Sequence, residues 1–259
     1  MGSFESSMAR FATLTDAELR RHWTWRVREL DVESALYRSL EEEMDAAARH
    51  VDAAAPPEAE RILALAQCAF GELRGLLVGR DDALLDRSPG AGSWPLRSAL
   101  THLLAMEPRY RQQTLVAAHQ KADTTGRFSP PAGIPPFAQP DDELGGVGDL
   151  LSALARERLE TDGALGSLSD DALAKPARWI GVDVDVRFRL HRFASHFVEH
   201  TVQCERILDA LGEPDTAARR IVRTISATRG AHEHGSPALI LEGLDRRHAE
   251  RVRSFVAEL

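Results

Sequence analysis

Apolar residues recur at helical spacing along almost the whole chain. Between residues 57 and 78 they follow one another at near-helical intervals: Ile62, Leu65, Phe70, Leu73 and Leu77. This spacing places their side chains on one stripe of a helix. The same period predicts further helices over about 15–50, 93–120, 148–166, 186–211, 215–229 and 237–258.

Proline and glycine mark the connections between these helices. Two adjacent prolines lie in residues 53–60, and residues 121–148 contain five prolines and five glycines. Both residue types favour turns, and proline also removes a backbone donor. The stretch RWIGVDVDVRF at 178–188 alternates apolar and polar residues, which by itself suggests a short strand. We interpret it instead as a connection in which Asp183 or Asp185 caps the next helix.

The order of these elements excludes several fold classes. The sequence shows no βαβ alternation, no glycine-rich phosphate loop and no convincing internal repeat. Helices separated by turns are the pattern of a helix bundle. We therefore predict an all-α protein.

Composition narrows the partners of this helical protein. The 259 residues carry a formal net charge of −8, which disfavours binding to nucleic acid or to an anionic membrane. Only Cys68 and Cys204 are present, so we expect no disulfide framework and a reducing compartment. The N-terminal stretch has no apolar core of the signal-peptide type, and no run reaches the roughly 18 apolar residues of a membrane span. We expect a cytoplasmic protein.

Histidines are concentrated in the stretch HRFASHFVEHTVQC at 191–204. On a helix, His196 and His200 lie one turn apart on the apolar face, whereas His191 lies on the opposite, polar face. Two imidazoles at this spacing can point at one divalent ion. The same pair also arises by chance in a chain with 10 histidines. A metal ligand pair and two core histidines therefore both remain open.

A third metal ligand has to come from another element. His102 flanks the apolar stripe of its predicted helix and is the candidate. Four histidines have charged or small neighbours and are expected at the surface: His22, His50, His119 and His248. His232 and His234 lie in AHEHGS, where we expect exposed side chains in a loop.

Two segments together resemble the DinB superfamily, also called the DinB/YfiT-like proteins. The first, GSWPLRSALTHLL at 92–104, has a tryptophan eight residues before a histidine, as Trp94 precedes His102. The second, at 191–214, has two histidines one turn apart, then Gln203, and it ends in a leucine–glycine turn.

The resemblance covers about residues 57–213. It implies an up-down-down-up four-helix bundle over these residues, with a helical extension at 1–56 and another at 214–259 that packs on the bundle. It also implies a divalent metal ion (nickel, zinc or iron) bound by His102, His196 and His200. Three neutral imidazoles would leave open positions on such an ion, which is typical of a catalytic site.

Related proteins use such an ion with low-molecular-weight thiols. The resemblance therefore implies a metal-dependent thiol S-transferase or isomerase, with a small-molecule thiol and an electrophilic substrate as partners. There are two alternatives. One is a metal-dependent hydrolase that uses bound water, and the other is a non-catalytic metal- or ligand-binding module of the stress-response type. The two helical extensions suggest a homodimer.

Several residues near these motifs have a second interpretation. HFVEH also fits the inverted zinc-peptidase motif with Glu199 as the base, but no strand pattern or far-downstream glutamate ligand accompanies it, so we expect a solvated carboxylate. Cys204 could be a fourth ligand or a redox thiol, and Trp94 could shape the site, but we expect Cys204 to fill the core and Trp94 to pack at the end of the bundle. We interpret Glu107 as a surface carboxylate.

Overall fold

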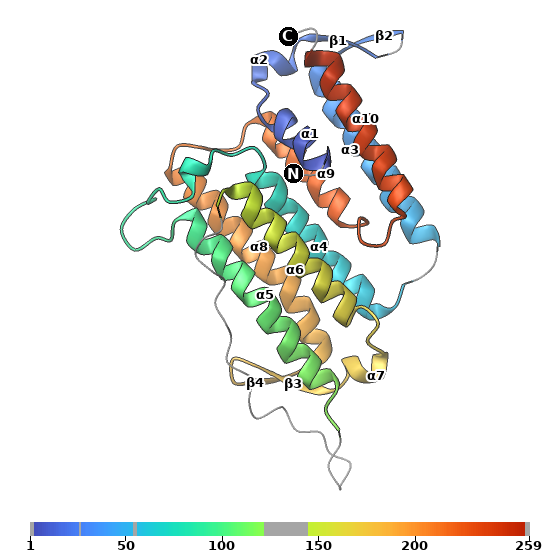
Figure 1. The fold of residues 1–259 in the computed structure, drawn as a ribbon, viewed down its shortest axis with the longest axis vertical. Coiled ribbons are helices and arrows are strands. Elements are labelled where there is room, and N and C mark those ends of the chain that lie inside the picture. The colour runs from blue at the N-terminus through green and yellow to red at the C-terminus, as the bar shows by residue number, and fades with distance from the viewer. Residues whose placement is uncertain (1–2, 26, 54–55, 122–144, 257–259) are drawn as a thin grey trace.

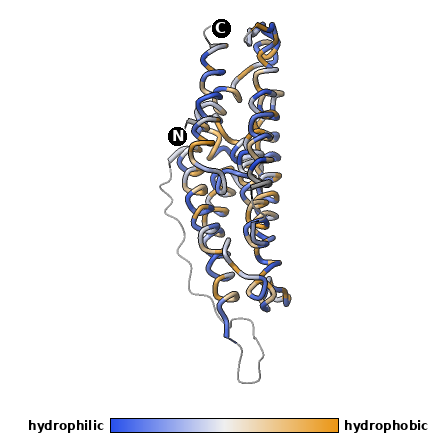
Figure 2. The backbone as a smooth tube through the Cα atoms, turned by 90° about the vertical axis from the view of Figure 1, so that its right-hand side faces the viewer, coloured by the Kyte–Doolittle hydropathy of each residue, from blue (hydrophilic) through white to orange (hydrophobic). Residues whose placement is uncertain are grey.

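The computed structural model of the chain describes residues 3–25, 27–53, 56–121 and 145–256. The helices form two bundles that lie side by side (Figure 1). In the side view of Figure 2, apolar and polar stretches alternate along the helices, as amphipathic packing requires. The fold class is all-α, as predicted, with two short β-hairpins. None of the helices in the described ranges is long and apolar enough to span a membrane.

Four helices form the first bundle: α4 (Glu58–Leu77), α5 (Leu96–Ala118), α6 (Val147–Leu165) and α8 (Val186–Ala210). Helices α4 and α8 run in one direction and α5 and α6 in the other (Figure 1). A short 3-10 turn, η1 (Asp82–Leu84), lies between α4 and α5. The core contains fully buried side chains from each helix, among them Phe70, Leu100, Leu154 and Phe197. The predicted loop at 121–148 falls mostly outside the described residues.

The two predicted extensions pack on each other. Together they supply the second bundle: α1 (Ser3–Ala12), α3 (Val32–Ala53), α9 (Ala217–Gly230) and α10 (Ala238–Val256). Its apolar core includes Phe11, Leu36, Val222 and Phe255, which come from all four helices. The division of the chain at residues 56 and 213 stays a prediction.

Two stretches that we did not assign to strands form β-hairpins. The helix predicted over 15–50 is confirmed from residue 32 onward as α3, but it is wrong before that, where α2 (Asp16–Leu19), β1 (His22–Trp25) and β2 (Arg28–Asp31) precede α3. The interpretation of 178–188 as a plain connection is also wrong, since β3 (Pro176–Trp179) pairs with β4 (Val182–Asp185). The alternating pattern there did indicate strands. Ile180 and Gly181 turn the second hairpin with φ values of 47° and 79°, the left-handed conformation that tight hairpins need.

The two hairpin segments have the same construction. Each residue of the second segment lies 154 positions after its counterpart in the first. Asp170 thus corresponds to Asp16, and Asp185 corresponds to Asp31. Thr15 and Ser169 cap the short helices that precede the hairpins. Asp31 and Asp185 then cap the long helices, each accepting a hydrogen bond from the amide three residues later, at 2.8 and 2.7 Å. The prediction of a cap at Asp183 or Asp185 is thus confirmed for Asp185.

This correspondence extends to the α-helices and hairpins of the described ranges. The order α1, α2, hairpin, α3, α4, α5 is followed by α6, α7 (Asp170–Leu173), hairpin, α8, α9, α10. The packing repeats as well, because α4 lies against α8 as α9 lies against α3, and α5 lies against α6 as α10 lies against α1. Our prediction that the chain has no internal repeat is therefore wrong. Each bundle takes two helices from each half of the chain.

The bundles meet where α4 packs along α9, which runs in the opposite direction. A Cβ atom on Gly71 of α4 would lie 2.3 Å from the carbonyl oxygen of Ser226, and one on Gly230 of α9 would lie 2.4 Å from that of Gln67. Only glycine leaves room for two backbones this close. The contact between the bundles therefore depends on these small residues.

A buried carboxylate ties the helices of the second bundle together. Glu43 of α3 accepts hydrogen bonds from Arg229 of α9 and from His232 and His248, at 2.7–3.0 Å. Burial by itself would raise the pKa of Glu43, but these hydrogen bonds hold it well below its usual range. The predictions that His232 and His248 are exposed are wrong. Both rings are buried and hydrogen-bonded to Glu43, which lies far from them in the sequence.

Replacing Gly71 with Ala tests the contact between α4 and α9. Alanine normally stabilises a helix by up to about 1 kcal/mol relative to glycine. Here the added methyl group meets backbone, so we expect Gly71→Ala to lower the free energy of unfolding by about 1–3 kcal/mol in urea titrations. Gly163→Ala in α6 is the matched control, because nothing lies within 4 Å of a Cβ there. Equal stabilisation by both substitutions would contradict the close approach.

Replacing Glu43 with Gln tests the buried charge cluster. We expect a loss of about 3–5 kcal/mol at pH 7, because the substitution removes the charge that pairs with the buried guanidinium of Arg229 and weakens the hydrogen bonds to two buried imidazoles. The folded pKa lies below the ordinary value of 4.5, so the stabilisation is present above pH 4.5 and is lost as the pH falls further. The gap between wild type and Glu43→Gln should narrow by about 1.4 kcal/mol per pH unit below 4.5.

Glu41→Gln serves as the control for that titration, since the side chain of Glu41 is 62% exposed on the same helix. It should change stability by less than about 0.5 kcal/mol at any pH. A gap for Glu43→Gln that stays constant down to pH 3.5 would be inconsistent with a carboxylate ionised in the fold.

Candidate metal centre

Three histidines from two helices come together inside the first bundle. His102 lies on α5, and His196 and His200 lie one turn apart on α8. One ring nitrogen of each lies within 4.8 Å of those of the other two. The ring centroids are 4.6–5.3 Å apart. The structure therefore brings together the three side chains singled out in the sequence.

Hydrogen bonds orient the imidazoles within this group. Nδ1 of His200 lies 2.7 Å from Oε1 of Gln203, and Nε2 of His200 lies 3.1 Å from Nε2 of His196. An amide oxygen only accepts, so Nδ1 of His200 carries the proton and Nε2 keeps its lone pair. That lone pair points toward the space shared with the other rings. Gln203 thus fixes the ligand-ready form of His200.

Burial keeps the three imidazoles uncharged. His196 and His200 are 5% and 7% exposed, and His102 is partly buried. Burial, followed by the neighbouring His200, Arg192 and His102, lowers the pKa of His196 to about 3. Burial also lowers the pKa of His102 and of His200. Neutral imidazoles are the form that binds a metal ion.

Aromatic rings form two walls of the group. The indole of Trp94 stacks on the ring of His200 at 6.4 Å and lies 5.4 Å from that of His102. Trp94 therefore borders the histidines, and the expectation that it merely packs at the bundle end is too limited. Tyr110, which we did not single out, lies 5.1 Å from His196. Its position about two turns after His102 on α5 is the signal that could have indicated it.

A charged pair lies on the rim of the site. Arg192 precedes His196 by one turn and donates to Oε2 of Glu199 at 2.7 Å. Its guanidinium also lies over the ring of Trp179, 5.2 Å from the centroid. The side chain of Glu199 is 60% exposed, which confirms a solvated carboxylate. Sequence reasoning missed Arg192, although its spacing of four residues before His196 placed it on the same side of the helix.

Two further residues near the motifs have clear roles in packing. Cys204 is buried in the apolar core, which raises the pKa of its thiol to about 12, so its interpretation as a core residue is confirmed. The interpretation of Glu107 as a surface carboxylate is wrong. Glu107 is buried and accepts a hydrogen bond from Arg158 of α6, which is itself fully buried. The sequence does not show that Arg158 of α6 faces Glu107, so this buried ion pair could not be predicted from it.

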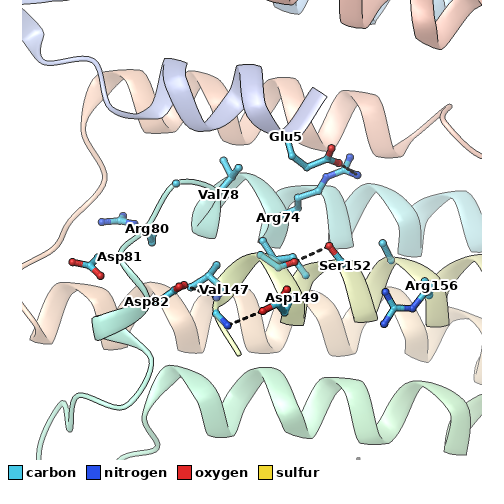
Figure 3. Close-up of a pocket in the computed structure, with 15 residues that line it drawn as sticks. Glu5, Arg74, Val78, Arg80, Asp81, Asp82, Val147, Asp149, Ser152 and Arg156 are labelled. Atoms are coloured by element: carbon cyan, nitrogen blue, oxygen red, sulfur yellow. Dashed lines mark hydrogen bonds and ion pairs between the residues drawn. The ribbon is translucent and has the colours of Figure 1, made fainter. Parts of the chain in front are cut away.

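A separate cavity of about 700 Å³ opens between α1, α4 and the start of α6 (Figure 3). None of the three histidines lines it. The first amides of α6 are already satisfied, because the amides of Val147 and Gly146 donate to Asp82 and Asp149 at 2.7 and 3.0 Å. Arg74, which lines the cavity, is paired with Glu233 at 3.1 Å. We therefore place the candidate chemistry at the histidines.

Comparison with known proteins agrees with the helical arrangement. The family model described as the DinB superfamily matches residues 65–204, more than half of the chain. The matched region contains all three histidines, the whole of α5 and α6, and most of α4 and α8. No curated protein and no solved structure gave a match. The chain belongs to the DinB superfamily.

Proposed function

We propose that His102, His196 and His200 hold a divalent metal ion, namely nickel, zinc or iron, and that the protein is a metal-dependent enzyme. The observation that carries this proposal is the convergence of three neutral ring nitrogens within 4.8 Å. Zinc and its neighbours accept imidazole nitrogen readily. The donor set therefore fits the metal.

Three protein ligands suit a catalytic site better than a structural one. When bound, the ion would act as a Lewis acid that lowers the pKa of a thiol or water and so provides a nucleophile at neutral pH. Trp94 is 44% exposed, so the site has a side that solutes can reach. Its indole and the phenol ring of Tyr110 would shield the reacting atoms from water on two sides.

The chemistry we propose is S-transfer or isomerisation with a low-molecular-weight thiol. Gln203 holds His200 in its ligand form, and burial prevents protonation of His196 from competing with the metal. The protein would then supply a positioned thiolate for attack on an electrophilic substrate. Membership in the DinB superfamily supports a metal-associated function. The homodimer expected from the sequence stays a prediction.

Elemental analysis tests the metal site. We expect about one divalent ion per chain in the wild type, and its loss in His102→Ala and His196→Ala, because two remaining imidazoles hold a metal far more weakly. His191→Ala is the matched control, since His191 lies exposed on the same helix and should leave the metal content unchanged. Equal, substoichiometric metal in all four proteins would rule out the site.

A thiol-transfer assay tests the reaction class. The zinc-loaded protein, with glutathione, cysteine or another cellular thiol and 1-chloro-2,4-dinitrobenzene, should form the thioether. The sulfur bonds to the ring carbon, chloride leaves and the thiol proton passes to the buffer. We expect the rate of transfer to fall at least about 100-fold in His196→Ala, because the thiol then keeps its ordinary pKa.

The same preparation distinguishes the alternatives. Hydrolysis of p-nitrophenyl acetate without added thiol, lost in His196→Ala, would favour the hydrolase in place of the transferase. Stoichiometric metal with neither activity would favour the non-catalytic binding module.

A further inference from the structure

The internal repeat allows the metal centre to be compared with its counterpart in the second bundle. Trp25 and Arg38 correspond to Trp179 and Arg192, because each pair is separated by the same 154 residues that relate the hairpins. In both bundles the guanidinium lies 5.2 Å from the centroid of the tryptophan ring. The arginine stacked on tryptophan is therefore a feature of the repeated unit.

The surroundings of the two arginines differ in charge. In the second bundle, Arg38 contacts the carboxylates of Glu41 at 2.9 Å and of Glu42 at 3.5 Å. Glu42 occupies the position that corresponds to His196, and its side chain is only 14% exposed. Glu42 also accepts hydrogen bonds from Arg247 and Arg251. The second bundle thus neutralises its arginine with a carboxylate where the first bundle has a metal-ligand histidine.

At the metal centre, no such buried carboxylate faces the arginine. Among the residues that the structure describes, Arg192 is paired with the exposed carboxylate of Glu199 and donates to Oγ of Ser195. Its Nε is buried and has no hydrogen-bond partner within the described ranges, which is also true of Nε of Arg38, so the two arginines differ in the carboxylates beside them. A divalent ion held by three neutral imidazoles would add two further positive charges beside it. Such a site favours an anionic ligand.

We propose that Arg192 binds a carboxylate of the substrate while the sulfur or other reacting atom of the same molecule occupies the three-histidine site. This inference rests on the proposed metal site and names the class of molecule it takes, a thiol that carries a carboxylate. Exposed ion pairs contribute only about 0–1 kcal/mol, so a substrate carboxylate can displace Glu199. Trp179 supports the guanidinium, whose two terminal nitrogens donate to Ser195 and Glu199 in the structure and would turn to the two oxygens of the substrate carboxylate.

Cobalt(II)-loaded protein tests this inference without an assay of turnover. Binding of a thiolate to cobalt gives an intense near-ultraviolet sulfur-to-metal band, and the thiol proton passes to the buffer. We would titrate mercaptoacetate, 3-mercaptopropionate and 4-mercaptobutyrate, each against its uncharged amide. For at least one chain length, the wild type should bind the acid at least about 10-fold more tightly than the amide, equivalent to about 1.4 kcal/mol.

Two variants separate a direct contact from a general effect of charge or stability. Arg192→Gln should bind cobalt and the amides as the wild type does but lose the preference for the acid. Arg192→Lys should keep part of the preference, because it retains the charge without the paired donors. Arg38→Gln is the matched control in the second bundle and should keep the full preference.

The possible results lead to different conclusions. If the wild type binds acid and amide equally at every chain length, or if Arg38→Gln loses the preference as Arg192→Gln does, the role of Arg192 is refuted while the metal site stands. If the wild type binds no cobalt, the proposed function and this inference both fail.

Discussion

The arrangement of this protein depends on the close approach of α4 and α9. Each helix belongs to a different bundle, and their backbones are near enough at Gly71 and Gly230 that a single methyl group would meet a carbonyl oxygen at 2.3–2.4 Å. Because α4 lies in the first half of the chain and α9 in the second, this contact also joins the two halves. A constraint on backbone separation, rather than a particular polar bond, therefore sets the relation of the bundles.

The two bundles use the same plan and place different chemistry inside it. The second bundle contains a glutamate, Glu43, with its cationic and imidazole partners, all linking helices through charged hydrogen bonds. The first bundle contains three imidazoles that burial keeps neutral, with their ring nitrogens close together. The second bundle therefore holds charge in a closed network. The first bundle brings neutral ring nitrogens together near a common point, which is what a metal ion requires.

Much of the candidate site followed from local spacing, and the rest did not. His196 and His200 share a face because four residues make about one helical turn, and His102, a candidate from its apolar stripe, was joined to them by the resemblance to the DinB superfamily. Arg192 and Tyr110 obey the same spacing rules, yet nothing in the sequence says that their helix faces meet the histidines. Trp23 and Trp25 are two residues apart, which is the spacing of a strand, but the segment was included in a long predicted helix, so the first hairpin was missed.

The sequence by itself determined the helical class, the helix caps such as Asp185, and the pair of histidines on one helix, since each depends on residues within a turn or two of one another. Only the tertiary structure decided that the two halves interlace and that His102 faces the pair. It also decided that His232 and His248 lie buried against Glu43, 189 and 205 residues away. Periodicity reports which face of a helix is apolar, whereas the partner of that face is chosen by packing between distant segments.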